Sequence, residues 1–532
     1  MRKMPLGMQS FRKIVEGEYI YVDKTQYVYD LINSVSHYFL SRPRRFGKSL
    51  LLDTVSEVFS GDKELFKGLY IYDSDYCFEK HPVIRLDMSN IANKTPEALE
   101  ESISQVLKER AYEDELNLLG NTTPDLFRQL IKALHKKYNK KVVVLIDEYD
   151  KPILDHLIDL ETADANRQVI KSFYGILKSM DPFLRFTFIT GVSKFTKTSL
   201  FSELNNLLDI TMTKRYSNIC GIEVEDLKKY FGEHIKHFST HEDFKRYDNI
   251  HDEILAWYDG YSWDGTTRLI NPFSLLSFFL QNRFSGFWYS SGTPAFLIKL
   301  IKENPSSFLS LNKLEISERS LDTFDIHKMK IVPLMFQTGY LTVGERRFRG
   351  DSESYVLRMP NLEVKEAFYL SIIEEFTENE DNTEAAYWQI KDSLKTGDLD
   401  SILLVLKSLF ASIPYQLHIR REAYYHSIFI ALMNVLGFQC NAEVSTATGR
   451  IDAVLELDDK VYIVEFKYND CPQDATPEEK AEMFKKALVE GIVQIKDKGY
   501  SKKYSTCGKK VYQAAFAFLG KDEIEMMVEI VD

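Results

Sequence analysis

The feature that most limits the fold of this chain is a Gly-Lys-Ser triplet between an apolar run and a helix-forming run. Residues 39–41 are mostly apolar, Gly47, Lys48 and Ser49 end the following loop, and residues 50–55 open a helical pattern. Strand, loop and helix in this order are the context that a phosphate-binding P-loop requires. The leading glycine of the G-x-x-x-x-G-K-[ST] motif is absent, because Arg42 occupies its position. The motif is therefore half matched.

Apolar runs alternating with helical patterns predict a parallel sheet. The runs include residues 82–87, 141–147 and 184–191, and helical patterns lie at about 96–111, 125–138 and 166–180. The unbroken β-branched run before Asp147 indicates a strand that is buried on both faces, as in a sheet covered by helices. We therefore predict a doubly wound α/β domain, with helices on both faces of the sheet, over residues 1–212.

Two motifs on this sheet predict a nucleotide site. Gly47, Lys48 and Ser49 supply backbone N–H groups, a lysine for the β- and γ-phosphates and a hydroxyl for Mg²⁺. Asp147 and Glu148 end the buried strand, where ligands bind in such sheets. Asp147 would hold Mg²⁺, and Glu148 would orient an attacking water. We expect ATP and Mg²⁺ as cofactors, while the choice between ATP hydrolysis and simple ATP binding stays open.

Other polar residues near the loop are candidates for phosphate contacts. Arg44 and Arg45 could replace missing backbone contacts by charge. Together with Arg42, they either serve the phosphates or report the nucleotide state. Thr190, at the end of the last predicted strand, is a candidate for sensing the γ-phosphate, and a threonine at the edge of the core is the alternative.

A second constellation lies near the C-terminus. Residues 449–456 and 460–467 read as paired strands. Because side chains alternate along a strand, Glu465 and Lys467 share one face, and Asp452 on the preceding strand can join them. Two converging carboxylates can hold Mg²⁺, or Mn²⁺ in its place, and the lysine can orient the attacking water.

Flanking helices complete this predicted nuclease site. Glu422 opens a helix at about 422–436 and is a candidate third metal ligand, whereas Gln494, on a helix at about 478–497, could bind the water or a substrate phosphate. The alternative is an exposed hairpin with ordinary charges. Nearby lysines make this end locally basic; they are Lys485, Lys486, Lys496, Lys498, Lys502 and Lys503.

The region between the two sites carries no recognised chemistry. Residues 213–373 are helical and rich in aromatic residues, and they end in a helix and a hairpin whose turn contains Arg346, Arg347 and Arg349. This pattern is compatible with a winged-helix module and equally with a packed hairpin. The acidic residues 374–382 predict a linker, and residues 383–532 are expected to hold a helical pair and the nuclease-like domain.

Composition limits the partners. The net charge of −12 argues against a general nucleic-acid coat, although local basic patches can still bind phosphates. The five cysteines lack disulfide or zinc spacing. No signal peptide or membrane span is recognisable, so we expect a cytoplasmic protein with no membrane partner.

Four motifs of the N-terminal half resemble those of bacterial AAA-ATPase-like proteins: YVDKT (21–25), RPRRFGKS (42–49), LIDEYD (145–150) and WYDGY (257–261). Asp452, Glu465, Lys467 and Gln494 resemble the PD-(D/E)xK nuclease domain that such proteins carry at the C-terminus. The resemblance implies a P-loop ATPase fused to a restriction-endonuclease-like fold, with Arg42 as the family's own variant. The chain departs from the nuclease pattern at Ile451, where a proline normally precedes the aspartate.

The sequence thus predicts an ATP-regulated, Mg²⁺-dependent nuclease, with DNA favoured as substrate. The alternative is a nucleotide-dependent switch or scaffold whose nuclease-like domain binds DNA or a partner without cutting. The choice between DNA and RNA stays open, as does the oligomeric state, including a homo-oligomer.

Overall fold

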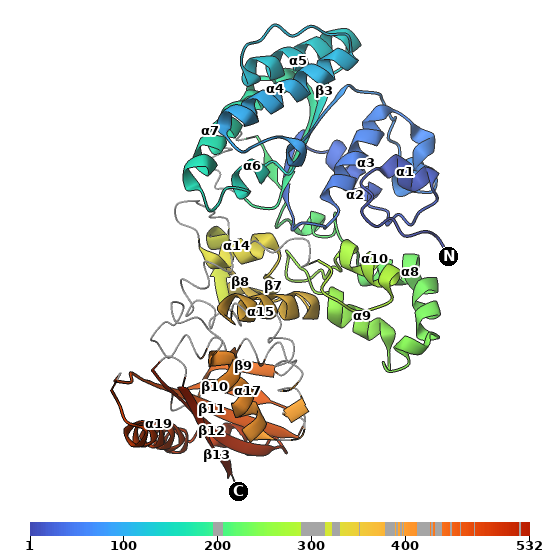
Figure 1. Cartoon of the computed structure of the whole chain (residues 1–532). Coiled ribbons are helices and arrows are strands. Elements are labelled where there is room, and N and C mark those ends of the chain that lie inside the picture. Colours follow the sequence, from blue (N-terminus) through green and yellow to red (C-terminus); the bar gives the residue numbers. More distant parts are fainter. Residues whose placement is uncertain are drawn as a thin grey trace. The chain divides into compact units, whose positions relative to one another are not determined.

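The structure is a computed structural model (Figure 1) that describes residues 1–194, 206–288, 314–321, 330–349, 352–377, 398–411 and, with short gaps, 439–531. A few single residues between 389 and 433 are also described. The chain forms two compact units. The first comprises Met1–Gly292 and Glu315–Leu362, and the second comprises Thr293–Leu314 and Glu363–Asp532.

A five-stranded sheet forms the centre of the first unit, with the order β2-β3-β4-β1-β5. All neighbouring strands are parallel. The strands are β1 (His37–Ser41), β2 (Val83–Asp87), β3 (Val142–Asp147), β4 (Leu184–Gly191) and β5 (Leu208–Asp209). The predicted strands and the α/β class are confirmed. Strand β5 was not predicted, because two residues are too few to give a recognisable sequence pattern. Every residue of β3 is buried, as its β-branched run predicted.

Helices cover both faces of this sheet. Helices α1 and α2 pack with α3 on one face, and α4, α5 and α7 pack together on the other (Figure 1). The helices are α1 (Phe11–Glu16), α2 (Thr25–Ile32), α3 (Lys48–Ser60), α4 (Pro96–Glu113), α5 (Thr123–Tyr138), α6 (Lys151–Leu154) and α7 (Leu160–Ser179). Thr95 and Thr122 cap α4 and α5 by accepting backbone N–H groups. The helices predicted at 96–111 and 125–138 are confirmed to within two residues at their ends, whereas α7 begins six residues before the start predicted at 166.

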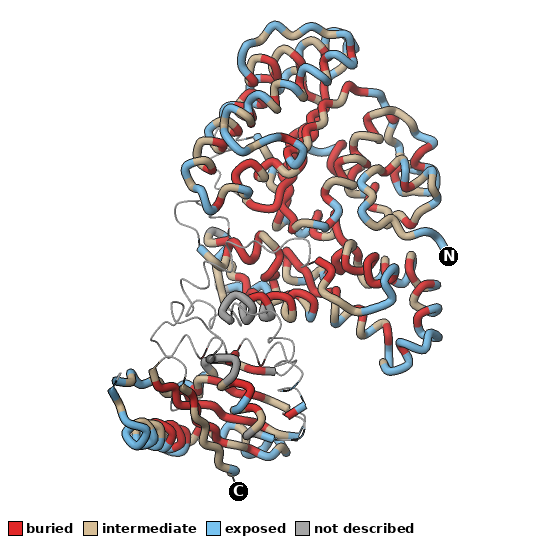
Figure 2. The backbone as a smooth tube through the Cα atoms, in the orientation of Figure 1, coloured by how far each residue is buried: buried red, intermediate tan, exposed pale blue. Residues whose placement is uncertain are grey.

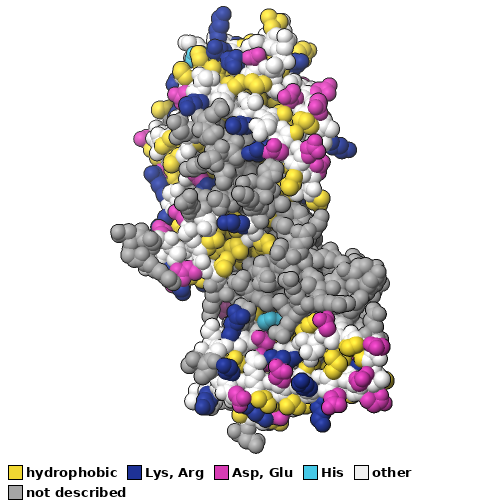
Figure 3. All heavy atoms as spheres, turned by 90° about the vertical axis from the view of Figure 1, so that its left-hand side faces the viewer, with side chains coloured by type: hydrophobic (Ala, Val, Ile, Leu, Met, Phe, Trp, Pro, Cys, Tyr) yellow, Lys and Arg dark blue, Asp and Glu magenta, His cyan; other side chains and the backbone are white. Residues whose placement is uncertain are grey.

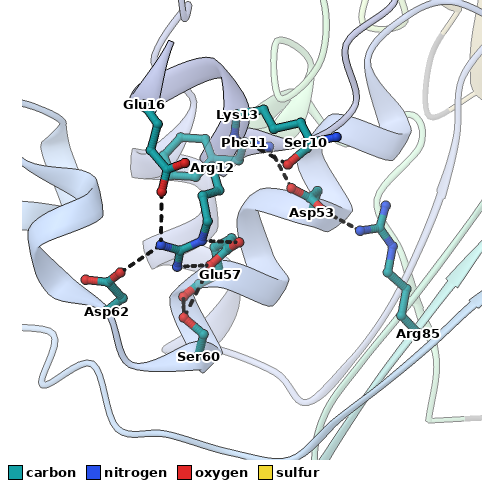
Figure 4. A network of polar contacts seen from close by, with 10 residues as sticks. All are labelled: Ser10, Phe11, Arg12, Lys13, Glu16, Asp53, Glu57, Ser60, Asp62 and Arg85. Carbon is teal, nitrogen blue, oxygen red and sulfur yellow. Dashed lines mark hydrogen bonds and ion pairs between the residues drawn. The ribbon is translucent and has the colours of Figure 1, made fainter. Parts of the chain in front are cut away.

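A charged network ties α1 to α3, the helix that follows the predicted P-loop (Figure 4). Arg12 of α1 forms ion pairs with Glu57 at 2.8 Å and with Asp62 at 3.1 Å. The Asp53 carboxylate of α3 accepts the backbone N–H of Phe11 at 2.6 Å and pairs with Arg85 of β2. The N-terminal helix is therefore fixed to α3, and α3 in turn to the sheet.

The chain after β5 adds a helical layer with its own aromatic core. It contains α8 (Val224–Ser239), α9 (Ile250–Tyr258) and α10 (Pro272–Gln281). Phe231, Phe238, Tyr258 and Phe278 are among its buried residues. Figure 2 shows buried stretches along these helices. By packing, this layer belongs to the same compact unit as the parallel sheet.

The predicted helix and hairpin are present at the end of the first unit. Helix α14 (Ile331–Thr338) precedes β7 (Thr342–Arg349) and β8 (Ser352–Arg358), which pair antiparallel. Together with β6 (Leu314–Ser317) they make the sheet β6-β8-β7, beside α13 (Glu318–Leu321). Arg346 pairs with Glu353, and Arg347 with Glu345 at 2.8 Å. The prediction that Arg346, Arg347 and Arg349 lie in the turn is wrong, because β7 runs through all three. Arg346 and Arg347 are partly neutralised within their own sheet.

The second unit contains a mixed five-stranded sheet with the order β13-β12-β11-β10-β9. Strands β11 and β12 are parallel and are joined through α19, whereas the other neighbours pair antiparallel. The strands are β9 (Gln439–Ser445), β10 (Arg450–Glu456), β11 (Lys460–Asn469), β12 (Lys510–Leu519) and β13 (Glu523–Val531), and the helices are α15 (Leu362–Thr377), α17 (Leu399–Ala411), α19 (Pro477–Asp497) and the 3-10 helix η8 (Tyr500–Tyr504).

The predicted hairpin of residues 449–467 is confirmed by the pairing of β10 with β11. Helix α15 runs through residues 374–377, the first part of the stretch predicted as a linker, and residues 378–382 lie outside the described part of the chain. Among the described helices, none combines the length and the apolar character needed to cross a bilayer.

Candidate functional site

The loop between β1 and α3 turns through two residues in the left-handed region. Arg45 has a φ of +66° and Gly47 a φ of +93°. No atom lies within 4 Å of the position of a Gly47 Cβ, so its backbone angle, rather than lack of space, favours glycine there. The φ of Arg42 is not positive. The loop therefore makes its turns at positions 45 and 47, and it does not need glycine at position 42.

Arg42 is fully buried and binds the protein itself. Its Nη1 atom donates to the carbonyl oxygens of Ser41 and Thr211, each at 2.9 Å. Its Nη2 atom donates to the Tyr216 carbonyl at 3.3 Å, and the guanidinium carbon lies 4.0 Å from the centroid of the Trp263 ring. Burial lowers the pKa of Arg42 to about 10, so it stays charged at neutral pH. Arg42 thus builds the loop, because its guanidinium donates to carbonyl oxygens of the protein itself.

Aromatic residues surround the back of the loop, and we call them the aromatic collar: Phe46, Tyr261, Trp263, Phe273 and Trp288. The Phe46 ring centroid lies 4.9 Å from that of Tyr261 and 5.2 Å from that of Trp263. The Arg45 guanidinium lies 4.7 Å from the Phe273 ring centroid, and the Trp288 indole donates to the Arg44 carbonyl at 3.1 Å. The region in which the sequence indicated no chemistry therefore shapes the loop.

Lys48 lies inside the loop and is 4 % exposed. Its Nζ atom donates to the carbonyl oxygens of Arg42 and Pro43, each at 2.9 Å. Arg45 and Gly47 are exposed, and Ser49 is half-buried at the first turn of α3. The outer surface of the loop is therefore open to solvent, while the lysine is held against its inner carbonyls.

The predicted acidic pair lies at the end of β3. Asp147 is buried, and its Oδ1 atom accepts the Thr190 hydroxyl at 2.6 Å and the Glu148 backbone N–H at 3.1 Å. Glu148 has a φ of +48°. Burial raises the pKa of Glu148, and the Lys48 charge opposes the rise. Thr190 is fully buried, and its hydroxyl holds Asp147.

These groups meet at one edge of the sheet, because β4 lies between β1 and β3 and Thr190 is in register with Leu40. The edge presents backbone N–H groups at a helix N-terminus, an ammonium group, a hydroxyl and two carboxylates. This donor set fits the phosphates of a nucleoside triphosphate with a divalent cation.

The second unit brings together four side chains that the sequence predicted for a nuclease site. Lys467 of β11 donates to the Gln494 Oε1 atom at 2.7 Å, and Gln494 of α19 donates to the Glu465 Oε2 atom at 2.8 Å. The Lys467 ammonium lies 3.9 Å from the Glu465 carboxylate. Asp452 of β10 accepts the backbone N–H of Phe466 at 2.9 Å. The side-chain alternation along β11 places Glu465 and Lys467 on the same face.

Glu465 carries a buried carboxylate that the protein only half satisfies. The residue is 0 % exposed, and its Oε1 atom receives no hydrogen bond. Burial raises the pKa of Glu465 to about 9, and the Asp452 charge adds to the rise. A proton or a cation between the two carboxylates removes this cost. The pair therefore fits a divalent cation with oxygen ligands.

The remaining predicted ligand, Glu422, lies outside the described residues. Across the described part of the chain, no group of three or more His, Cys, Asp or Glu side chains converges on a metal position. Two further residues touch the site: the His426 Nε2 atom lies 2.8 Å from the Asp452 carbonyl, and Tyr500 donates to the Arg450 carbonyl at 2.8 Å. The sequence patterns did not indicate Tyr500, which lies beyond the predicted helix at about 478–497.

Comparisons with known proteins match a different family in each of two parts of the chain. A family described as "Predicted AAA-ATPase" (AAA-ATPase-like) matches residues 5–201, and the PD-(D/E)XK nuclease superfamily matches residues 420–527. An "Uncharacterized protein in vnfD 5'region" from Azotobacter chroococcum mcd 1 is 36 % identical over 523 residues, covering 97 % of this chain and 96 % of the relative. The chain belongs to this AAA-ATPase-like family with a C-terminal PD-(D/E)XK nuclease domain. The predicted family membership is therefore confirmed.

Solved structures resemble this AAA-ATPase-like protein weakly. The Aeropyrum pernix ORC2 protein in complexes with ADPNP and ADP is 10 % identical, covers 66 % of this chain and 93 % of its own, and has a TM-score of 0.27. Drosophila ORC bound to poly(dA/dT) DNA and Cdc6 is 15 % identical, covers 57 % of this chain and 44 % of its own, and has a TM-score of 0.22.

Proposed function

We propose that this AAA-ATPase-like protein is an ATP-regulated, Mg²⁺-dependent nuclease that cleaves phosphodiester bonds, with DNA as the favoured substrate. The observation that carries the proposal is the buried Glu465 carboxylate. Its Oε1 atom receives no hydrogen bond, its Oε2 atom lies 3.9 Å from the Lys467 ammonium, and burial, together with the Asp452 charge, raises the pKa of Glu465. A buried carboxyl pair of this kind costs free energy unless a proton or a cation lies between the groups. Such a cost is more readily retained at a functional site than in an ordinary hairpin.

Each residue has a defined role in the proposed reaction. Asp452 and Glu465 would hold the divalent cation, which supplies a water of lowered pKa and positive charge for the phosphate. Lys467 would orient the attacking water and balance charge that develops on the phosphate. Gln494 fixes the Lys467 and Glu465 side chains relative to each other through its amide. Glu422 remains a proposed third ligand.

The nucleotide site would act as the regulator. Lys48 would exchange its contacts with the loop carbonyls for phosphate oxygens, with Arg44 and Arg45 adding charge from the loop. Ser49 and Asp147 would hold the cation, while Thr190 would act by orienting Asp147. Glu148, whose pKa is raised by burial, is the proposed base for ATP hydrolysis.

The proposed nuclease does not rest on a uniformly basic surface. On the face shown in Figure 3, Lys and Arg side chains are interspersed with Asp and Glu over the second unit. Lys485 and Lys486 of α19 are exposed, whereas Lys496 pairs with Glu529. Contacts with the nucleic-acid backbone would therefore be local to the site.

A cleavage assay with DNA and RNA substrates tests the nuclease. Wild-type protein should cleave DNA in the presence of Mg²⁺, and Asp452→Ala and Lys467→Ala should each abolish cleavage, while Lys485→Ala on the exposed face of α19 should cleave normally. Cutting that survives both site substitutions would sink the assignment. Metal binding without cleavage of either nucleic acid would support the alternative, a switch or scaffold protein.

A parallel experiment tests the regulator. Lys48→Ala should remove ATP binding in calorimetry, and Lys136→Ala on the exposed surface of α5 should leave it unchanged. Cleavage by the wild type should differ between ATP and ADP, and Lys48→Ala should lose that difference. Cleavage that ignores the nucleotide in the wild type would reject ATP regulation and leave the nuclease proposal intact.

A further inference from the structure

Helix α14 places a buried glutamine at the end of β4, the strand that carries Thr190. Gln337 is 5 % exposed. Its Oε1 atom accepts the backbone N–H of Lys194 at 3.0 Å, and its Nε2 atom donates to the Leu321 carbonyl of α13 at 3.0 Å. Gln337 therefore links the segment after β4 to α13 and α14, although Lys194 lies 143 residues earlier in the chain.

Both polar atoms of the Gln337 amide are used, and the two partners have opposite requirements. The backbone N–H of Lys194 can only donate a hydrogen bond, and the Leu321 carbonyl can only accept one. The amide supplies an acceptor and a donor from one planar group, so it satisfies both. An apolar side chain at position 337 would take a partner from each backbone group, which costs free energy in the interior.

The segment after β4 is also fixed to the end of β3. The Thr190 hydroxyl donates to Asp147 at 2.6 Å. The backbone N–H of Ser193 donates to the buried Asp150 carboxylate at 2.5 Å. Gln337 holds the next residue, so the segment is clamped between the acids that follow β3 and α14. A shift of this segment would move the hydroxyl that holds Asp147.

The C-terminal end of α14 lies against the loop that follows β1. Gly339 ends the helix with a φ of +96°. A Cβ atom at position 339 would lie 2.9 Å from the Cβ and Cγ atoms of Pro43, which is closer than such atoms pack. The Pro43 carbonyl accepts from Lys48 at 2.9 Å. The same helix therefore contacts the loop after β1 and the segment after β4, and both belong to the proposed nucleotide site.

We propose that Gln337 is a positioning residue of the nucleotide site, which fixes the segment after β4 so that the Thr190 hydroxyl keeps Asp147 in the orientation that Mg²⁺ binding needs. The inference rests on the proposed binding of ATP and Mg²⁺ at this site. It assigns Gln337 no contact with the nucleotide or the cation.

The test is Gln337→Met, which keeps an unbranched side chain of similar size and removes both polar atoms. We expect ATP affinity in the presence of Mg²⁺, measured by calorimetry, to fall about three- to tenfold, while metal-free ATP affinity stays at the wild-type value. Thr338→Val on the same helix is the matched control, because the Thr338 hydroxyl donates to the Leu334 carbonyl of α14 itself at 2.7 Å. This control should match the wild type with and without Mg²⁺.

A second variant guards against a loss of folding, which thermal melts detect. Gln337→Asn keeps the amide but is shorter by one methylene group, so it cannot reach both backbone groups. It should show the same loss of ATP affinity, confined to the titration with Mg²⁺, and it decides the question if Gln337→Met does not fold.

A double-mutant comparison isolates the route through Thr190. Because Gln337 acts through the Thr190 hydroxyl, adding Gln337→Met to Thr190→Val should cause little further loss of ATP affinity in the presence of Mg²⁺. Additive losses in the double variant would overturn the inference, as would an equal loss with and without Mg²⁺ or wild-type affinity in Gln337→Met. A wild type that binds no ATP would instead overturn the proposed nucleotide site, and the inference with it.

Discussion

Replacing Arg42 by glycine restores the common P-loop motif, and we predict that this substitution harms the protein. In the structure Arg42 donates to the carbonyl oxygens of Ser41, Thr211, Tyr216 and Ser217, at 2.9, 2.9, 3.3 and 3.4 Å. Glycine would leave these carbonyls without the guanidinium and would open a cavity beneath the Trp263 ring. It would also gain nothing at position 42, where φ is not positive.

The size of the effect follows from these contacts. Four hydrogen bonds at about 1 kcal/mol each, together with a new cavity, are partly offset by the relief of a buried charge, which leaves a net loss of about 3 kcal/mol. For a unit of this size that loss lowers the unfolding midpoint by about 4 °C. The side chain of Arg42 also fixes the backbone whose carbonyl accepts from Lys48 at 2.9 Å. Without that side chain Lys48 is held less firmly, so ATP affinity should fall about tenfold, or about 1.4 kcal/mol.

The assay combines thermal unfolding with ATP calorimetry on the wild type, Arg42→Gly and Arg42→Lys. The lysine variant keeps the charge but lacks the planar fork that reaches several carbonyls at once, so it should fall between the other two proteins. An Arg42→Gly protein with wild-type melting and equal or tighter ATP binding would refute the structural role of Arg42.

Three further predictions concern other parts of the chain. Thr190→Val removes the hydroxyl that donates to Asp147, so it should weaken ATP binding in the presence of Mg²⁺ and leave metal-free ATP binding unchanged. An equal loss of ATP affinity with and without Mg²⁺ in calorimetry would contradict a role of Thr190 in orienting Asp147. The pKa of Glu465 is raised from 4.5 to about 9, so the metal-free second unit should lose stability as the pH rises between these values. Mn²⁺ competes with the proton for the carboxylate, so it should bind more tightly as the pH rises from 6 to 9. If thermal melts and Mn²⁺ calorimetry both show no dependence on pH, Glu465 is not a buried acid. Arg12→Ala breaks a partly exposed network of ion pairs, so the free energy of unfolding should fall by no more than about 1 kcal/mol, and by less in high salt. A large loss of thermal stability that does not depend on salt would show that Arg12 acts through packing instead.

Local patterns were enough to predict much of the fold. The run before Asp147 is apolar at every position because β3 is buried on both faces, and this is a signal that a sequence displays directly. The approach of Glu465 to Lys467 follows from the two-residue repeat of a strand. Gln494 was predicted from its helix and from the nuclease resemblance, and in the structure this helix connects the parallel strands β11 and β12 and packs against them.

Contacts between distant residues were beyond the sequence patterns. Arg42 and Trp263 are far apart in the chain, and no local periodicity links an arginine at a loop to an indole in another layer. For the same reason the sequence left Thr190 as a candidate sensor of the γ-phosphate or a threonine at the edge of the core, and the bond from its hydroxyl to Asp147 was not predicted. Tyr500 was missed because the bond to Arg450 depends on how η8 leaves α19.

The aromatic collar also bears on how the sequence can change during evolution. The Trp263 ring packs against the Phe46 ring and against the Arg42 guanidinium, although Trp263 lies in a distant segment of the chain. A mutation at one of these positions therefore changes what selection tolerates at the others. Among relatives, we expect glycine or a small residue at position 42 to occur together with a different residue at position 263, so the nucleotide loop and the helical layer should evolve as a single block.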